Sequence, residues 1–330
     1  MNATEKMESI LGLARGFSAS RVLLCGAELD LFTFLAKSPM TAEETASAKN
    51  ADLHGITILL DALCALGFIS KKNGRYKTEP SVVSFLSADA PDSILPMVLH
   101  SATLWKTWSG LTDVVLGKTI PKLEKTGALA KDHITSFIGA MHVVGSRMAP
   151  EVVTAVNPGK ARNLLDVGGG SGTYTLAFLA QVPEMKATLF DLPRVIEMAQ
   201  ARIQEAGMTN RVTLVPGDFY TDSLPPGSDL ALLSAIIHQN SPEQNLMLYQ
   251  EIYKALDKGG RIIIRDHVMS EDRTKPIEGA MFAVNMLVGT PGGGTYTFDE
   301  IQNGLTAAGF VRINLIRTKG MFSLVEGFKP

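Results

Sequence analysis

Four polar residues in the second half of the chain each follow an apolar run. The end of such a run is a position at which a side chain can contact a ligand. Asp191 follows ATLF, Asp218 follows VTLVPG, His238 follows LLSAII and Asp266 follows RIIIR. Carboxylates accept hydrogen bonds from hydroxyl and amino groups, and a histidine can take a proton near neutral pH. This set predicts a ligand site at which Asp191 and Asp218 bind a ligand and His238 can act as a base.

A glycine-rich turn upstream of these residues indicates the kind of ligand. In LLDVGGGSGT, Asp166 ends an apolar run, and Gly168 and Gly170 let backbone N–H groups approach a ligand closely. Gly172 is not followed by lysine, which excludes a triphosphate loop, and Thr173 stands where a dinucleotide motif needs its third glycine. S-adenosylmethionine has no phosphates and carries two positive groups, so an acid beside the turn favours this cofactor.

These residues must be positioned by a sheet whose strands end at one edge. Strand-like segments recur at 186–190, 211–215, 230–234 and 261–265, with helical patterns between them. This alternation predicts an α/β, Rossmann-like, doubly wound parallel sheet, in which ligands lie outside the carboxyl ends of the strands. Segments 311–316 and 322–327 predict a final antiparallel hairpin.

Composition limits the class of protein. The chain has 330 residues, 45% hydrophobic and 19% charged, with a net charge of −2, which predicts more than one domain and no field that attracts nucleic acid or an anionic membrane. Cys25 and Cys64 lie in apolar helical patterns, as expected of free thiols in a reducing compartment. No basic, apolar leader begins the sequence, and no His/Cys/carboxylate set has metal-binding spacing. We expect a cytoplasmic protein without a metal or a membrane span.

The first hundred residues have the pattern of a winged helix. Two helices are predicted over 6–37, a capped helix begins at Thr41, another spans 53–66 before Gly67, and Asn73-Gly74 marks a hairpin. The helix 53–66 contains no arginine or lysine, so it is a poor DNA-recognition helix. The apolar first helices instead predict a dimerisation module and a homodimer, although the basic hairpin keeps a DNA-binding regulator as the alternative.

Segment 80–156 predicts further helices with a loop near 117–127. Large side chains recur in this segment at helical spacing: Trp105, Trp108, Phe137, Met141 and His142. They pack in a core, or they wall a pocket for a flat apolar substrate. The domains expected are a dimerisation domain (1–100), connecting helices that line the substrate pocket (101–158) and a cofactor domain (159–330).

Several motifs together resemble one family. LLDVGGGSG, FDLPRV, PGDFY, the His238 segment, GGRIIIRDHVM and MLVGTPGGGTYTFDEIQNGLTAAGF are similar to those of S-adenosylmethionine-dependent O-methyltransferases of the caffeate and hydroxyindole type. The resemblance covers essentially the whole chain and implies a dimer with an N-terminal winged-helix dimerisation domain. It also implies conversion of S-adenosylmethionine to S-adenosylhomocysteine.

The resemblance assigns roles to individual residues. The residues expected to hold the cofactor are Asp166, Gly168, Gly170, Asp191, Leu192, Asp218, Phe219 and Ser234. His238 falls where the family has its catalytic base, Asp266 matches the acid that orients it, and Met286 and Thr290 match substrate-pocket positions.

This chain departs from the plant-type members at three places. Gln239-Asn240 replaces Asp-Trp after the histidine, Ser234 stands where those members have a cofactor-binding lysine, and Thr295-Tyr296 stands where a second acid is expected. The predicted function is methyl transfer to a hydroxyl of a small, flat, largely apolar acceptor. Methylation of carbon or nitrogen on the same fold, and a cofactor-sensing winged-helix regulator, are the alternatives.

Overall fold

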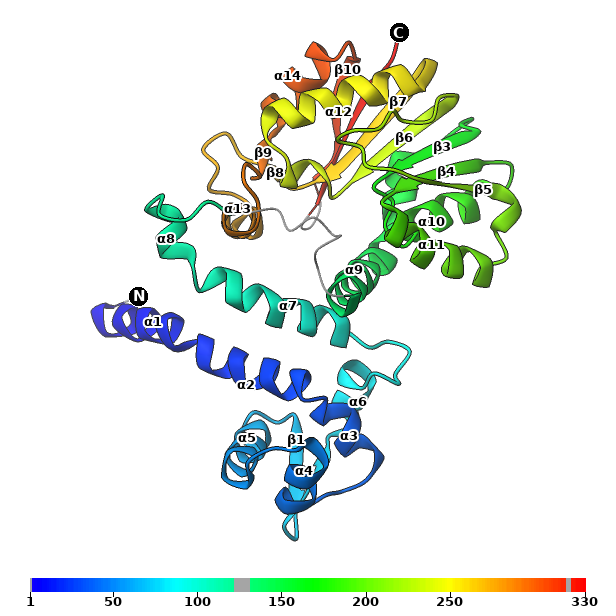
Figure 1. Cartoon of the computed structure of the whole chain (residues 1–330). Coiled ribbons are helices and arrows are strands. Elements are labelled where there is room, and N and C mark those ends of the chain that lie inside the picture. The colour runs from blue at the N-terminus through cyan, green and yellow to red at the C-terminus, as the bar shows by residue number, and fades with distance from the viewer. Residues whose placement is uncertain (1, 122–130, 319–321) are drawn as a thin grey trace. The chain divides into compact units, whose positions relative to one another are not determined.

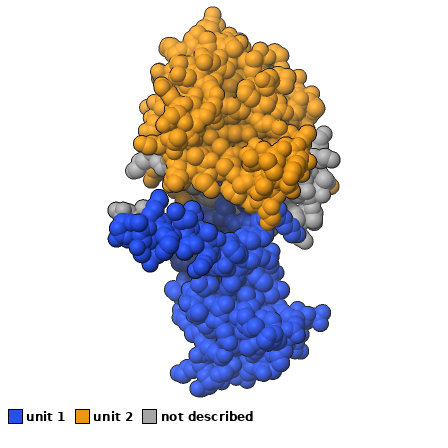
Figure 2. All heavy atoms as spheres, turned by 90° about the vertical axis from the view of Figure 1, so that its left-hand side faces the viewer, with its two compact units in different colours: residues 1–106, 130–143 blue, residues 107–129, 144–330 orange. Residues whose placement is uncertain are grey.

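The computed structural model describes residues 2–121, 131–318 and 322–330, with the backbone alone at 131–137, 140 and 144. The chain forms two compact units (Figure 2): Met1–Lys106 with Ala130–Val143, and Thr107–Leu129 with Val144–Pro330. The segment 101–158, expected to connect two domains, contributes to both units. Our three-part division of the chain stays a prediction.

The first unit is a helical domain with a small hairpin (Figure 1). Its elements are α1 (Ala3–Arg15), α2 (Phe17–Glu28), α3 (Leu31–Lys37), α4 (Ala42–Lys49), α5 (Leu53–Ala65), β1 (Ile69–Lys72), β2 (Arg75–Thr78), α6 (Pro80–Leu86), most of α7 (Leu95–Trp108) and the start of α9 (Lys131–Val156). Helices α4 and α5 followed by the antiparallel pair β1–β2 confirm the winged helix. The prediction of two helices over 6–37 was wrong, because the chain breaks at Gly16 and again at Asp30, which has a φ of 50°.

Local sequence explains the ends of these elements. The side chain of Thr41 accepts a hydrogen bond from the backbone of Glu44 and so begins α4 with a capping box. Asn73 and Gly74 have φ values of 51° and 75°, which make the tight turn between β1 and β2. Leu66, the last residue of the helix predicted over 53–66, lies just beyond the end of α5 at Ala65 and is 42% exposed.

The beginning of the first unit exposes apolar surface. Helix α1 contains no buried residue, and its large apolar side chains are exposed: Met7, Ile10, Leu11 and Leu13. By length and composition alone, the helical stretch Ala3–Glu28 is also long and apolar enough to cross a membrane. An isolated chain therefore leaves here a surface of the kind that partners cover.

The second unit is built on a seven-stranded sheet. Its strands are β3 (Asn163–Val167), β4 (Lys186–Asp191), β5 (Val212–Pro216), β6 (Ser228–Ser234), β7 (Leu256–Asp266), β10 (Val311–Arg317) and β11 (Ser323–Phe328). They lie in the order β10-β11-β7-β6-β3-β4-β5, with β3 to β7 parallel and β10 and β11 antiparallel. This arrangement confirms the doubly wound sheet and its final hairpin. A short parallel pair, β8 (Val268–Met269) with β9 (Tyr296–Thr297), was not predicted.

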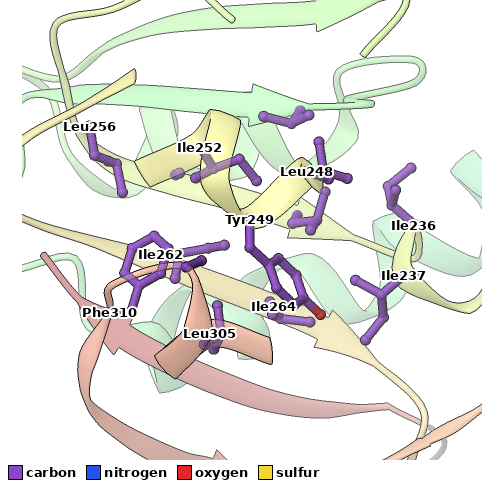
Figure 3. Packing of buried hydrophobic residues seen from close by; sticks show 14 of the residues in the cluster. Ile236, Ile237, Leu248, Tyr249, Ile252, Leu256, Ile262, Ile264, Leu305 and Phe310 are labelled. Carbon is purple, nitrogen blue, oxygen red and sulfur yellow. The ribbon is translucent and has the colours of Figure 1, made fainter. Parts of the chain in front are cut away.

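Helices cover both faces of this sheet (Figure 1). The helices of this unit are α8 (Leu111–Val115), the end of α9, α10 (Thr173–Gln181), α11 (Pro193–Glu205), η1 (Thr209–Arg211), η2 (Ile237–Gln239), α12 (Pro242–Ala255), α13 (Ile277–Gly289) and α14 (Phe298–Ala307). The end of α9, α10, α12 and α14 are among those that pack on the sheet. Ile262 and Ile264 of β7 pack with α12 and α14 (Figure 3), whereas Ile263 packs with α9 and α10. Side chains alternate along a strand, so Asp266 and Arg265 belong to opposite faces.

Candidate active site

The glycine turn joins β3 to α10 and is tied to the next strand. Gly168, Gly170 and Gly172 have φ values of 69°, 58° and 76°, a region that favours glycine. A Cβ at Gly168 would lie 2.6 Å from Cδ1 of Ile236, whereas one at Gly170 would meet no atom within 4 Å. The turn is therefore packed against the end of β6 on one side and open on another.

Asp191, at the end of β4, is held by backbone donors. The N–H of Gly170 donates to its Oδ2 at 2.8 Å, and the N–H of Leu192 donates to its Oδ1 at 2.7 Å. Burial raises the pKa of Asp191 to about 6, although both backbone hydrogen bonds oppose the rise. The carboxylate is thus fixed beside the glycine turn, with further lone pairs to offer a ligand.

Asp166, at the end of β3, has an internal partner. Its side chain is 1% exposed, and the hydroxyl of Thr175 in α10 donates to its Oδ2 at 2.6 Å. Burial raises the pKa of Asp166 to about 6, against the effect of this hydrogen bond. The contact fixes α10 on β3, and a direct contact between Asp166 and the cofactor stays a prediction.

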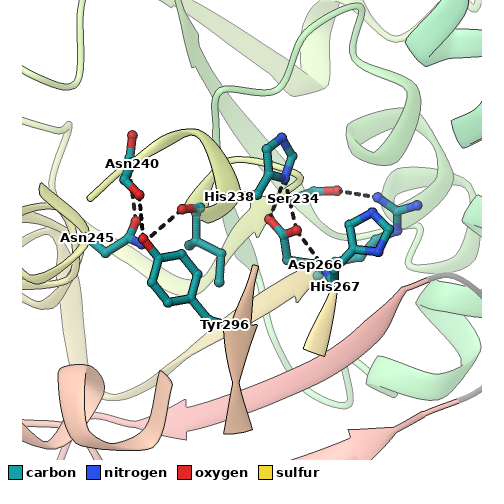
Figure 4. Close-up of polar contacts among 9 residues, drawn as sticks. Ser234, His238, Asn240, Asn245, Asp266, His267 and Tyr296 are labelled. Atoms are coloured by element: carbon teal, nitrogen blue, oxygen red, sulfur yellow. Dashed lines mark hydrogen bonds and ion pairs between the residues drawn. The ribbon is translucent and has the colours of Figure 1, made fainter. Parts of the chain in front are cut away.

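Asp218 and Phe219 follow β5, at the edge of the sheet beyond Asp191. The carboxylate of Asp218 accepts the N–H of Tyr220 at 3.0 Å, and the Phe219 ring lies 4.7 Å from the Tyr220 ring. Asn240, which replaces the tryptophan of plant-type members, is completely buried and accepts from the Tyr220 hydroxyl at 2.5 Å. Asn240 also donates to Asn245 at 2.9 Å (Figure 4). The replaced position is therefore part of a buried polar network.

His238 and Asp266 form a pair at the ends of β6 and β7 (Figure 4). Nδ1 of His238 lies 2.9 Å and 3.0 Å from the two carboxylate oxygens of Asp266. A carboxylate only accepts, so Nδ1 carries the hydrogen and Nε2 is left to accept a proton. Burial alone would raise the pKa of Asp266, but attraction and hydrogen bonds from His238, with the N–H of His267, lower it. Asp266 therefore remains ionised as the partner of the histidine.

Backbone geometry places the histidine over this acid. Ala235 has a φ of 58°, uncommon for a residue with a side chain, and its N–H donates to the carbonyl of Arg265 at 2.8 Å. The chain turns there into η2, which carries His238. Gly294 then donates to the carbonyl of His238 at 2.8 Å, and a Cβ on Gly293 would lie only 2.4 Å from the same oxygen. The glycines of TPGGG are needed for this close approach.

Helix α13 lies beside the histidine. The ring of Phe282 meets the His238 ring edge-on at 4.8 Å. Asn285 accepts a hydrogen bond at 2.8 Å from the indole of Trp108, which belongs to the same unit. Met286 and Thr290 are buried, and the Thr290 hydroxyl donates to the Met286 carbonyl at 2.8 Å. Contact of these last two residues with a substrate stays a prediction.

The other predicted substrate residues lie elsewhere. Trp105, Met141 and His142 belong to the first unit, where the Trp105 ring lies 6.4 Å from that of Phe17. The side chain of Phe137 lies outside the described residues. A pocket that includes these four residues therefore stays a prediction.

Sequence reasoning missed three residues of this region: Phe282, Asn285 and Arg265. The first two have only the signal of an apolar helix (IEGAMFAVNM). Arg265 had a stronger signal, because it is a cation within the apolar strand RIIIRD, and a charged side chain is rarely buried without a partner. Its Nη1 donates to the hydroxyl of Ser234 at 3.2 Å.

Comparison with known proteins shows the family of the chain. The family model described as an O-methyltransferase domain matches residues 122–311, and the one described as an O-methyltransferase dimerisation domain matches residues 11–87. A 3-hydroxy-5-methyl-1-naphthoate 3-O-methyltransferase of Streptomyces sahachiroi is 31% identical, over 96% of this chain and 94% of that protein. Acetylserotonin O-methyltransferase of Gallus gallus is 28% identical over 100% of both chains.

Solved structures give the same result. Human N-acetylserotonin methyltransferase in complex with S-adenosylmethionine has a TM-score of 0.83 and 26% identity, over 100% of this chain and 99% of that one. A structure described as PigF with S-adenosylhomocysteine has a TM-score of 0.85 and 25% identity, over 98% of this chain and 99% of that one. The chain therefore belongs to the S-adenosylmethionine-dependent O-methyltransferases that carry an N-terminal dimerisation domain.

Proposed function

We propose that this methyltransferase acts on a hydroxyl of a small, flat, largely apolar acceptor of aromatic or polyketide type, with His238 as general base. The observation that carries the proposal is the pairing of His238 Nδ1 with both oxygens of buried Asp266, which leaves Nε2 to accept a proton. A positioned base of this kind contributes a rate factor of about 10²–10⁴.

The residues at the strand ends fit the cofactor. Asp191 is anchored beside a turn that has open space at Gly170, which suits hydrogen bonds from both ribose hydroxyls. Asp218 and Phe219, one strand further, suit the amino group and the face of adenine. When bound, S-adenosylmethionine supplies an electrophilic methyl group and leaves as S-adenosylhomocysteine.

The chain's own contribution is alignment and proton removal. A phenol has a pKa of about 10, so at neutral pH its hydroxyl needs a base as its oxygen forms the new bond to carbon. His238 Nε2 takes that proton, and Asp266 stabilises the imidazolium that results. No described residues form a group of three or more histidine, cysteine or acid side chains able to hold a metal ion.

The class of acceptor is inferred from the relatives and from the walls of the site. One relative is described as acting on a hydroxynaphthoate, others as acetylserotonin O-methyltransferases, and one as an 8-O-methyltransferase of tetracenomycin polyketide synthesis. Phe282 supplies aromatic surface beside the histidine, and the Trp108 indole is hydrogen-bonded to Asn285 of the same helix as Phe282. We further propose that the chain works as a homodimer through its dimerisation domain.

A panel assay with labelled S-adenosylmethionine tests the function. Hydroxynaphthoates, hydroxyindoles and phenolic polyketides are compared with matched acceptors whose hydroxyl is replaced by hydrogen. We expect label only in the hydroxylated members, released as a methyl ether. Transfer to the matched acceptors would indicate carbon or nitrogen methylation, and retention of genomic DNA fragments in a gel shift, with no transfer, would favour a regulator.

The winged helix gives that last outcome little support. Lys71 pairs with Asp61 at 2.7 Å, and Arg75 pairs with Glu44 at 2.8 Å, so two cations of the hairpin are bound within the domain. These exposed pairs contribute little to stability, but they occupy side chains that phosphates would need.

A further inference from the structure

Arg265 is a buried cation whose hydrogen-bonding capacity is mostly unused. Its side chain is 3% exposed, and Nε and Nη2 are both buried without a hydrogen-bond partner. Burial accordingly lowers the pKa of Arg265. Each unmet buried donor costs about 1–3 kcal/mol, and more when the group is charged. Such an arrangement is expected where the partner is a ligand.

The surroundings of Arg265 add a further donor and two aromatic faces. The centre of its guanidinium lies 3.8 Å from the Phe322 ring and 4.9 Å from the Tyr174 ring. The Tyr174 hydroxyl is also buried without a hydrogen-bond partner. The nearby cation Arg317 is already paired with Glu151 at 2.8 Å. The unmet groups here are thus N–H and O–H donors, which suit a carboxylate.

The order of the strands indicates which ligand carboxylate could reach these donors. Asp218 follows β5, Asp191 ends β4, the glycine turn follows β3, and Arg265 lies at the end of β7 beyond β6. With adenine at Asp218 and ribose at Asp191, the cofactor extends along this edge from β5 toward β7. Its amino-acid end then reaches the side of the glycine turn where Tyr174 and Arg265 lie.

We propose that Arg265, with the Tyr174 hydroxyl, binds the α-carboxylate of the methionine part of S-adenosylmethionine. The guanidinium offers two parallel N–H donors, the geometry that a carboxylate accepts best. Because both nitrogens are covered in the ligand-free chain, a neighbouring side chain must change rotamer to admit the carboxylate. This site deepens the proposed function at its cofactor, and it does not depend on His238.

Calorimetry with two matched ligands tests the site. Wild-type protein is titrated with S-adenosylmethionine and with decarboxylated S-adenosylmethionine, which lacks only the carboxylate. We expect the first to bind about 10- to 100-fold more tightly, the value of a charge-assisted pair. Equal binding of the two ligands by wild-type protein would overturn the proposal without any variant.

Variants then assign the effect to Arg265. In Arg265→Met, which keeps the length of the side chain, the two ligands should bind within about threefold of each other, and Tyr174→Phe should give an intermediate ratio. Arg317→Met is the control, because it removes a nearby charge already paired with Glu151, and it should keep the wild-type ratio. If Arg265→Met weakens both ligands equally, Arg265 has a structural role only.

The carboxylate can also come from the acceptor, and kinetics separates the two sources. The Michaelis constants of a hydroxynaphthoate and of the corresponding naphthol are compared in wild type and Arg265→Met. A selective rise for the hydroxynaphthoate, with the cofactor ratio unchanged, would overturn the assignment to the cofactor. Binding is measured without turnover, so failure of the His238 mechanism would leave these results intact.

Discussion

Two adjacent residues of β7 are equally buried but differ in how their charges are satisfied. Asp266 accepts hydrogen bonds from His238 and from the backbone of His267, whereas the Arg265 side chain makes a single hydrogen bond among the described residues, to Ser234. Alternation along the strand sends Asp266 toward the α12 face and Arg265 toward the α10 face. The comparison separates two kinds of site residue. One is fully organised before any ligand binds, and the other is complete only with a ligand.

The largest effect is expected where the organised pair acts. His238→Gln should lower turnover by about 10²–10⁴, because the proton acceptor is lost, and should change cofactor affinity by no more than about twofold. His54→Gln, the same substitution at an exposed position of α5, serves as the control. Steady-state kinetics across pH 6–9 with calorimetry measures both quantities. An unchanged rate would remove His238 from the mechanism.

Asp266→Asn should have a smaller effect through the same pair. The amide no longer stabilises the imidazolium, so we expect turnover to fall by about 10- to 100-fold, the usual effect of removing a carboxylate that orients a functional histidine. Cofactor affinity should stay near the wild-type value, in contrast to Arg265→Met. If Asp266→Asn lowered cofactor affinity and left turnover normal, Asp266 would be a cofactor-binding residue and not the partner of the base.

The pH dependence of cofactor binding tests the other acid at the strand ends. The pKa of Asp191 is about 6 rather than 3.8, so the carboxyl is ionised above pH 6 and protonated below it. If the ionised form binds the ribose, affinity should be full at pH 7.5 and fall to about a tenth at pH 5. The free energy of unfolding of the ligand-free chain should change with pH in the opposite direction to cofactor affinity. The raised pKa of Asp191 stabilises the folded chain at low pH, and this stability is lost as the pH rises through 6.

Calorimetry between pH 5 and 8 measures this dependence. Asp166 also has a pKa of about 6, so Asp166→Asn is the control, and it should keep the fall in affinity. A flat profile in wild-type protein would place the ribose away from Asp191.

The smallest effect is expected in the first unit, where helix α1 exposes apolar side chains that no other part of the described chain covers. Leu13 in α1 is 86% exposed. If a second chain covers it, Leu13→Gln should raise the dimer dissociation constant by about tenfold, and Glu8→Gln on the same helix should not. Sedimentation over a concentration series measures both. A monomeric wild type that binds lipid vesicles would mean that a membrane, and not a second chain, covers α1.

The sequence by itself determined the elements and what stands at their ends. Apolar runs that alternate with helical patterns predicted β3 to β7, the clustered glycines predicted the turn at Gly168, and a capping box predicted the start of α4 at Thr41. Because parallel strands bring their carboxyl ends to one edge, the gathering of Asp191, Asp218, His238 and Asp266 at that edge followed from strand order alone. These signals are local, since each depends on residues a few positions apart.

Only the tertiary structure decided which partner each polar group has. Asp166 is hydrogen-bonded to Thr175, and Asn240 to Tyr220 and Asn245. Arg265 lies near two rings, and its Nε and Nη2 have no hydrogen-bond partner. The exposure of Leu66 was decided in the same way, by where α5 stops. Such contacts depend on packing between segments distant in sequence, and hydrophobic periodicity carries no information about which buried donor meets which acceptor.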